Sequence, residues 1–356
     1  MQLKKEVTDR YTRFWNREKT DRACIFISRH VGEGGFRPPR TQEEAYLDAE
    51  YREPAILDYL QHTQYDLDGF PSVGAPFGAQ GLCSILTGYY RLAPTTIWYE
   101  SDPPYIENID DHPPFRLDKN SEVYRFIDEI ADRMLTHSDI CVTEITNIGC
   151  TFDILSAMIG SQNMLYEMAD HPDKVKKLRD EFIPVWVEYY LYLSQKLMNG
   201  QGCVSSWMPV WSDVPYYPIQ CDMSAMISPE MFREFVLPDL AYRSGVMGRT
   251  VYHLDGPDEI RHLDMILSLP RLNAVQWVAG AGNPISCDPC WYEMFRQIQA
   301  AGKGIILNEW VPHENLENLL RNVDQRGLYL ITSARDEQEA NEIADMAVRL
   351  NKEYKE

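Results

Sequence analysis

Eight short β-rich runs alternate with longer helical patterns along this chain, and this rhythm constrains the fold more than any other feature. The runs are mostly apolar and rich in β-branched and aromatic residues. They cover residues 22–30, 67–75, 139–149, 203–210, 249–256, 273–282, 303–310 and 328–334. Repeated βα units imply a parallel sheet with right-handed crossovers. Eight such units in 356 residues predict an α/β fold of the closed (β/α)8 type, a TIM barrel.

The whole chain, residues 1–356, is interpreted as one domain, because no low-complexity tract or Gly/Ser linker marks a boundary. Residues 78–120 are irregular and rich in Pro and aromatic residues, so we expect an inserted loop or hairpin after the second strand. An open doubly wound sheet is the alternative fold. Against it, no Gly-x-Gly-x-x-Gly opens a helix after the first strand.

Charge and composition exclude several classes of protein. Asp and Glu number 54 against 34 Lys and Arg, and the resulting net charge of −20 does not favour nucleic-acid binding. A hydrophobic content of 44% with 25% charged residues is typical of a globular protein with an ample core. The sequence has no run of 18 apolar residues, and its N-terminus lacks the apolar region of a secretory signal. We therefore expect a cytoplasmic protein that binds no membrane and keeps its cysteines reduced.

The sharpest candidate site is His253-Leu254-Asp255 at the end of the fifth predicted strand. In barrels of this type the reactive groups gather at the C-terminal ends of the strands. Residues two apart on a strand share a face, so His253 and Asp255 would meet there. The pair could bind a metal, or the carboxylate could orient an imidazole that acts as acid or base. The alternatives are a helix cap for Asp255 and a buried, hydrogen-bonded His253.

Two further segments add acidic and thiol groups at the same end. Glu309 follows a nearly all-apolar run, where a carboxylate is costly unless it is paired or solvated. Cys221 and Asp222 lie in the loop after the fourth strand, and this pair of ligand types suits zinc; a turn residue is the alternative for Asp222. We predict catalytic roles for His253, Asp255, Glu309 and Asp222, and metal ligation by His253, Asp255, Glu309 and Cys221.

Substrate contacts are expected from polar and aromatic residues near the same strand ends. An aromatic content of 12% suggests an aromatic-lined cavity for a flat or apolar ligand. The predicted substrate-binding residues are Arg29, His30, Asn147, Trp207, Tyr252, Gln276 and Trp277.

Several segments resemble the uroporphyrinogen decarboxylase superfamily, which also holds zinc-dependent methyltransferases that work with methyl-corrinoid proteins. The similar segments are TNIGCTFDILSAMIGSQNMLYEMADHPDKVKKL, DMSAMISPEMFREFVLPDL, VYHLDGPDEIRHLDMILSLPRLNAVQWVAGAG, and the last strand and helix. Order and spacing agree from about residue 20 to residue 350. The resemblance implies a (β/α)8 barrel. By analogy with the superfamily, whose members often dimerise, it also suggests a homodimer.

The methyltransferase branch places His-x-Cys at the end of the fifth strand and another Cys near the end of the eighth. Here His253 matches the histidine, Asp255 stands where the first Cys would be, and Thr332 or Ser333 where the second would be. Zinc ligation by thiols is therefore not reproduced. The residues of this chain leave a harder N/O site from His253 and Asp255, with Glu309 or Cys221-Asp222, and oxygen-rich sites broaden the choice of metal.

The decarboxylase branch carries a close pair of N-terminal arginines that bind substrate carboxylates. Arg29 matches the first, but the next arginine is Arg37, and Thr332-Ser333 replaces a histidine after the last strand. Uroporphyrinogen carries eight carboxylates, so the loss of cations from an acidic protein should weaken its binding.

We therefore expect metal-assisted methyl transfer between a small methylated substrate and a corrinoid carried by a partner protein, with zinc as the implied metal. The first alternative is a cofactor-free decarboxylase of uroporphyrinogen or a related aromatic or pyrrole acid, in which Asp222, Arg29 and His253 would act. The second is a non-catalytic barrel that binds a ligand or a corrinoid partner.

Overall fold

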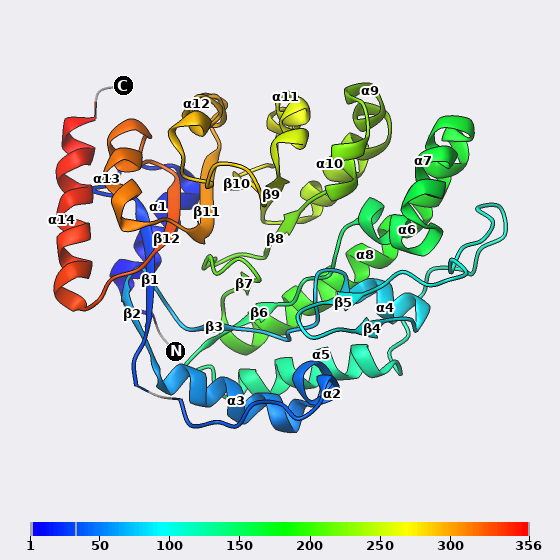
Figure 1. Cartoon of the computed structure of the whole chain (residues 1–356), viewed down its shortest axis with the longest axis horizontal. Helices are drawn as coiled ribbons and strands as arrows, with labels where there is room; N and C mark the ends of the chain where they lie inside the picture. The colour runs from blue at the N-terminus through cyan, green and yellow to red at the C-terminus, as the bar shows by residue number, and fades with distance from the viewer. Residues whose placement is uncertain (1–2, 33, 355–356) are drawn as a thin grey trace.

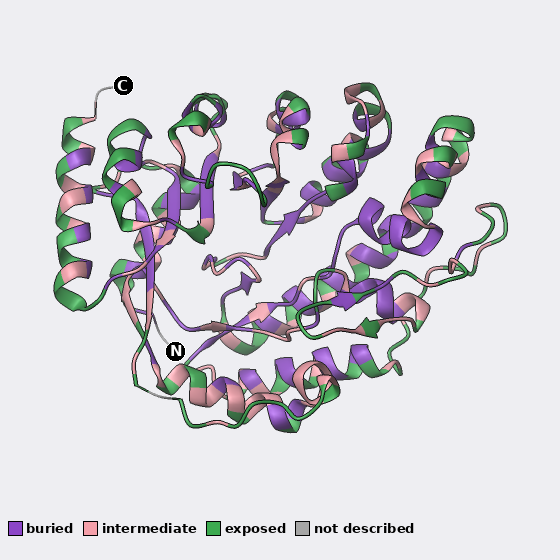
Figure 2. Cartoon of the chain, in the orientation of Figure 1, coloured by how far each residue is buried: buried purple, intermediate pink, exposed green. Residues whose placement is uncertain are grey.

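The computed structural model describes residues 3–32 and 34–354, and its architecture is mixed α/β. Strands lie inside and helices line the outside of the molecule (Figure 1). The strands are largely buried, whereas the outer helices bury one face and expose the other (Figure 2). Such two-sided helices are expected when an apolar stripe packs on a sheet. Within residues 3–32 and 34–354, none of the helices combines the length and apolarity that crossing a membrane requires.

The main sheet has seven strands, of which all but the edge strand β2 run parallel to their neighbours. Their order is β2 (Thr63–Leu67), β1 (Cys24–His30), β12 (Leu328–Thr332), β11 (Gly304–Trp310), β10 (Ala274–Val278), β9 (Arg249–Asp255) and β8 (Tyr216–Ile219). A second parallel sheet contains β3 (Ser72–Val73), β6 (Val142–Ile145) and β7 (Ser205–Ser206). A hairpin pairs β4 (Arg91–Leu92) with β5 (Ile97–Trp98).

A strand forms in each of the eight predicted ranges, but hydrogen bonds do not close the strands into one ring. Among the described strands, no ladder joins β1 to β3 or β7 to β8. At the first gap, the antiparallel strand β2 occupies the edge of β1 from Phe26 to His30. At the second, β7 is only two residues long, and the chain turns back so that Val204 bridges Ser212. The closed barrel predicted from the sequence is therefore not found as a continuous ladder.

Helices connect most of the strands, and several helical segments contain or begin with a short 3-10 or π turn. The α-helices are α1 (Lys5–Asn16), α2 (Gln42–Leu47), α3 (Ala49–Gln61), α4 (Gly81–Thr87), α5 (Glu122–Leu135), α6 (Thr151–Ile159), α7 (Ser161–Asp170), α8 (Pro172–Gln201), α9 (Pro229–Met231), α10 (Leu237–Val246), α11 (Leu263–Leu267), α12 (Tyr292–Ala300), α13 (His313–Asn322) and α14 (Glu337–Glu353). Short 3-10 or π turns are η1 (Asp222–Met226), η2 (Phe232–Val236), η3 (Pro257–His262) and η4 (Pro289–Trp291). The expected insertion at 78–120 holds α4 and the β4–β5 hairpin.

Strand β9 shows how the sheet presents polar groups. Tyr252 and Leu254 are fully buried, whereas His253 and Asp255 are only partly buried. Successive side chains point to opposite faces of a strand, so one face of β9 packs into the core and the other carries His253 and Asp255. Gly256 follows with a φ of +90°, a conformation that glycine adopts without steric cost.

Candidate functional site

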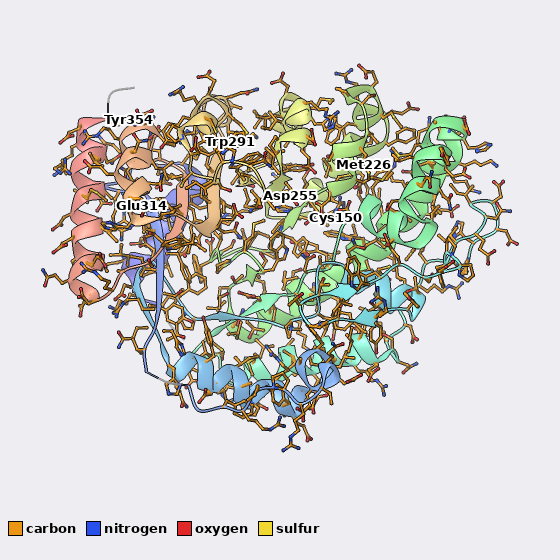
Figure 3. The ribbon with its side chains drawn as sticks, viewed as in Figure 1. Cys150, Met226, Asp255, Trp291, Glu314 and Tyr354 are labelled. Carbon is orange, nitrogen blue, oxygen red and sulfur yellow. The ribbon has the colours of Figure 1, made fainter. Side chains whose placement is uncertain are left out.

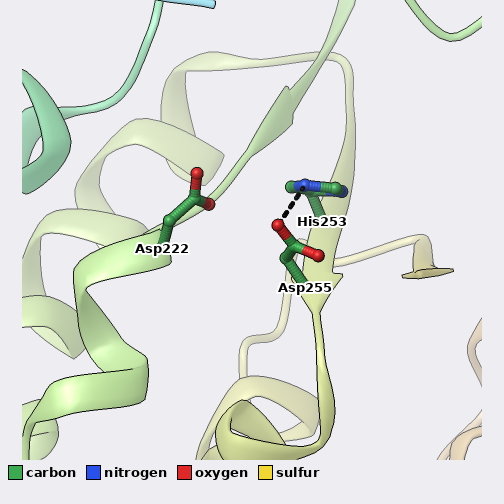
Figure 4. Close-up of side chains that lie close together, drawn as sticks. All are labelled: Asp222, His253 and Asp255. Atoms are coloured by element: carbon green, nitrogen blue, oxygen red, sulfur yellow. Dashed lines mark ion pairs between the residues drawn. The ribbon is translucent and has the colours of Figure 1, made fainter. Parts of the chain in front are cut away.

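Three side chains from two segments converge at the C-terminal end of β9. Asp222, His253 and Asp255 each offer one ligand atom, and these atoms all lie within 4.8 Å of one another. His253 Nε2 lies 3.9 Å from Asp255 Oδ2, and Asp222 on η1 faces the pair (Figure 4). The pairing of β8 with β9 brings Asp222 to this point, because Ile219 at the end of β8 lies beside Tyr252.

The proton on His253 is placed by its neighbours. His253 Nδ1 bonds to Gln276 Oε1, and Gln276 Nε2 donates to Asn308 Oδ1 at 2.6 Å. An amide oxygen can only accept, so His253 Nδ1 is the donor and carries hydrogen. In a neutral ring the Nε2 lone pair is then directed toward Asp255. A hydrogen bond from the other ring nitrogen to a carbonyl oxygen is the contact that commonly orients metal-binding histidines.

Trp207, which follows β7, packs against the same imidazole. The ring centroids of Trp207 and His253 are 5.4 Å apart and their planes meet at 87°. His253 is only 12% exposed at its side chain, whereas Asp255 is 41% exposed. The imidazole is therefore held by Trp207 and Gln276, and the carboxylate beside it remains open to solvent.

Two buried acids that the sequence reasoning missed lie next to the cluster. Glu259 is fully buried; its Oε2 accepts hydrogen bonds from the Asp255 amide at 3.3 Å and the Tyr252 hydroxyl at 3.4 Å. Burial, together with the nearby Asp222 charge, raises the pKa of Glu259 to about 9. Asp153 on α6 is 7% exposed, and its Oδ1 accepts from the Met223 amide at 3.1 Å.

The carboxyl groups around Asp222 disfavour one another's charge. Burial and then the Asp222 charge raise the pKa of Asp153 above its ordinary value. Solvent reaches part of the Asp222 side chain, but the protein around its carboxyl and the nearby Asp255 also raise the pKa of Asp222. A set of carboxylates that repel one another in this way favours the binding of protons or a cation.

Two predicted metal ligands lie elsewhere. Within the described part of the chain, neither Cys221 nor Glu309 joins the group of donors around His253. Cys221 is buried, and burial raises the pKa of its thiol well above the ordinary value, which disfavours the thiolate. Glu309 is exposed and accepts a hydrogen bond from Ser286, whose oxygen in turn accepts from the Ala279 amide. Glu309 therefore helps hold the loop after β10.

The two predicted N-terminal substrate contacts have local partners. Arg29 Nε donates to Asp66 Oδ2 at 2.6 Å across the β1–β2 pair. His30 is exposed, and its ring stacks on Tyr59 with centroids 6.1 Å apart. The positive charge of Arg29 is thus paired within the sheet edge.

Three other predicted substrate contacts bond to or pack against residues outside the cluster. Tyr252 and Trp277 are fully buried, and Trp277 packs against Trp291 with ring centroids 4.9 Å apart. Asn147 is half-buried, and its Oδ1 accepts from the Gly149 amide at 2.9 Å, which shapes the loop before α6. Of the predicted substrate contacts, Trp207 and Gln276 are the ones that touch His253.

The signal for Asp153 is present in the sequence. It is the only charge in α6, whose other residues, apart from Thr151 and Ser156, are apolar. A buried charge in an apolar helix needs a partner or a special role.

The similarity of this chain to known proteins lies in its fold. It resembles the solved structure of a methyltransferase from Methanosarcina mazei, with a TM-score of 0.59 and 11% sequence identity, over 98% of each chain. No protein-family model matches the sequence. No curated protein matches it either. The likeness therefore supports the mixed α/β architecture over the full length of the chain.

Proposed function

We propose that this chain is a metal-assisted methyltransferase, in which Asp222, His253 and Asp255 hold a divalent cation. The observation that carries this proposal is the convergence of three ligand atoms within 4.8 Å, one of them an imidazole nitrogen. The fold likeness to a methyltransferase favours the same activity. The methyl group would move between a small methylated substrate and a corrinoid carried by a partner protein.

The donor set fits a catalytic rather than a structural metal. One nitrogen and two carboxylate oxygens leave a coordination position open for substrate, as in three-ligand zinc sites. Gln276 would keep the His253 ring in the tautomer that presents Nε2. When bound, the metal would supply Lewis-acid polarisation of a substrate heteroatom. The partial exposure of Asp255 leaves the open side accessible to that substrate.

We also propose that the two sheets are two arcs of one (β/α)8-type barrel wall. Trp207 follows β7 of the small sheet and touches His253 on β9 of the large sheet. Contact between these two strand ends supports a shared mouth, where active sites of such barrels lie.

Decarboxylation of a polycarboxylate is the less favoured function. It would require cations that face the substrate, and Arg29 is already paired with Asp66. A non-catalytic barrel would keep the fold but would show no turnover, so it is an outcome of the test below.

Metal binding tests the proposal directly. Protein purified without chelator is analysed for metal, and zinc affinity is measured by competition with a chromophoric chelator. We expect about one metal per chain, its loss in His253→Ala, and roughly 10- to 100-fold weaker affinity in Gln276→Leu. His171→Ala, on an exposed helix end, is the control. The proposal fails if excess zinc does not bind, or if His253→Ala binds it as the wild type does.

Turnover is tested separately. Metal-loaded protein is assayed anaerobically with a corrinoid protein and candidate methyl donors, and the corrinoid absorbance reports methyl transfer. Metal binding without methyl transfer to or from any corrinoid would refute the methyltransferase activity and support a non-catalytic barrel.

A further inference from the structure

A cavity of about 340 Å³ adjoins the proposed metal group and shares Asp222 with it. It lies between residues 96–100 of the β5 segment, helix α6 and turn η1. Figure 3 labels Met226, Cys150 and Asp255 in this part of the molecule. A volume of this size suits a small ligand rather than a tetrapyrrole.

The cavity is acidic on one side. Its lining includes Glu100, Asp153 and Asp222, and among the residues that the structure describes no Lys, Arg or His lines it. Asp153 is more than nine-tenths buried, and its Oδ2 has no hydrogen-bond partner within residues 3–32 and 34–354. A buried carboxylate oxygen without a partner is costly, and a cationic ligand would offset that cost.

Part of the remaining lining is soft and apolar, although Gln80, Thr96, Ser156 and Ser161 also line the cavity. Trp98 is 48% exposed and Met226 is 54% exposed, and both line the cavity with Met223. Arg91, which is outside the lining, stands 5.7 Å from the Trp98 ring centroid, so a bound ligand would share this ring with the guanidinium. Indole faces attract alkylated ammonium groups, and thioethers pack against their methyl groups. A site for a bare metal ion would need oxygen ligands and no such apolar lining.

We infer that this cavity binds the ammonium group of a small alkylated cation. The inference rests on the proposed function and names its substrate class: a compound whose cationic end lies against Asp153 and Trp98, while its reacting heteroatom faces His253 and Asp255. An anionic substrate, such as a sulfonate or polycarboxylate, would instead meet three carboxylates in the same cavity.

The test uses choline and its uncharged isostere, 3,3-dimethyl-1-butanol, which has the same shape without the charge. Binding is measured by isothermal titration to the full chain in the presence of chelator, so that no metal takes part. We expect choline to bind at least about 10-fold more tightly than the isostere, a difference typical of a desolvated cation–aromatic contact.

Two variants locate the binding. Asp153→Asn keeps an oxygen that can accept from Met223 and replaces the unpartnered Oδ2 by an amide that cannot ionise, and Trp98→Leu removes the indole of a half-exposed residue. Each should weaken choline binding about 10-fold. Asp173→Asn, a surface acid whose side chain is 94% exposed, is the control and should change nothing.

The outcomes separate the two proposals. Equal binding of choline and the isostere, or binding that Asp153→Asn and Trp98→Leu both leave unchanged, overturns the inference while the metal result stands. Selective choline binding in a protein that takes up no metal supports the cavity and refutes the metal-assisted mechanism.

Discussion

Replacement of Glu259 by Gln should make the protein more stable at neutral and alkaline pH. Glu259 is fully buried, and burial and then the Asp222 charge raise its pKa from 4.5 to about 9. Between these two pKa values the folded protein holds a proton that the unfolded chain has released. The folded state therefore binds more protons, and stability falls as pH rises through this window.

The magnitude follows from the size of the window. Each pH unit inside it changes the free energy of unfolding by about 1.4 kcal/mol. Between about pH 5.5 and pH 8 the wild type should lose roughly 3 kcal/mol on account of Glu259 alone. Gln carries no charge in either state, so Glu259→Gln lacks this loss. Because Glu259 is neutral in the folded protein over this range, the substitution leaves the charges of Asp222 and Asp255 unchanged.

Urea unfolding in the presence of chelator, followed by far-ultraviolet circular dichroism at several pH values, measures the effect. Between about pH 5.5 and pH 8 the stability of Glu259→Gln relative to the wild type should rise by roughly 3 kcal/mol. Glu293→Gln, at a side chain that is 87% exposed, is the matched control. Parallel curves for wild type and Glu259→Gln across this range would refute the reasoning, because Glu259 would then be ionised in the folded state.

Three further predictions concern close packing, a buried ion pair and thiol chemistry. Gly69→Ala should destabilise the fold by about 1–3 kcal/mol or more, since its Cβ would lie 2.3 Å from a carbonyl oxygen of β1; Gly35→Ala, with open space around it, should not. Arg243→Met should cost about 3–5 kcal/mol, because it leaves the Asp239 carboxylate buried and unpaired, and adding Asp239→Leu should recover most of the loss in urea unfolding. Of the eight cysteines only Cys290 is exposed, so a thiol reagent should modify a single group per native chain and none in the Cys290→Ser variant.

The eight predicted strand positions could be found because most of them are apolar runs between helical patterns. The way in which the strands pair could not. The β2 segment, TQYDL, is polar and short, and nothing in its pattern shows that it covers the edge of β1. The β8 segment, YYPI, contains Pro218 and was included in a predicted loop, yet it forms a ladder with β9. Pairing of this kind depends on tertiary contacts that local pattern does not encode.

The candidate site also contains contacts that could be predicted from the sequence and one that could not. Period-two alternation predicted that His253 and Asp255 share a face, and they do. The same alternation excludes Tyr252 from that face, and it separates Gln276 from Trp277, so those two residues could not both contact the substrate. The approach of Asp222 depends on the register between β8 and β9, and no signal within its own segment marks that contact.

The row formed by Asn308, Gln276 and His253 has a consequence for how this protein can change over evolutionary time. Asn308 on β11 accepts from the Gln276 amide on β10 and so fixes its direction. The Gln276 oxygen then determines that Nδ1 of His253 on β9 carries hydrogen. A replacement at position 308 that reverses the donor and the acceptor would therefore change which nitrogen of His253 carries hydrogen, two strands away. We expect descendants of this chain to keep the three residues together or to replace them together, because the orientation of the His253 ring depends on both amides.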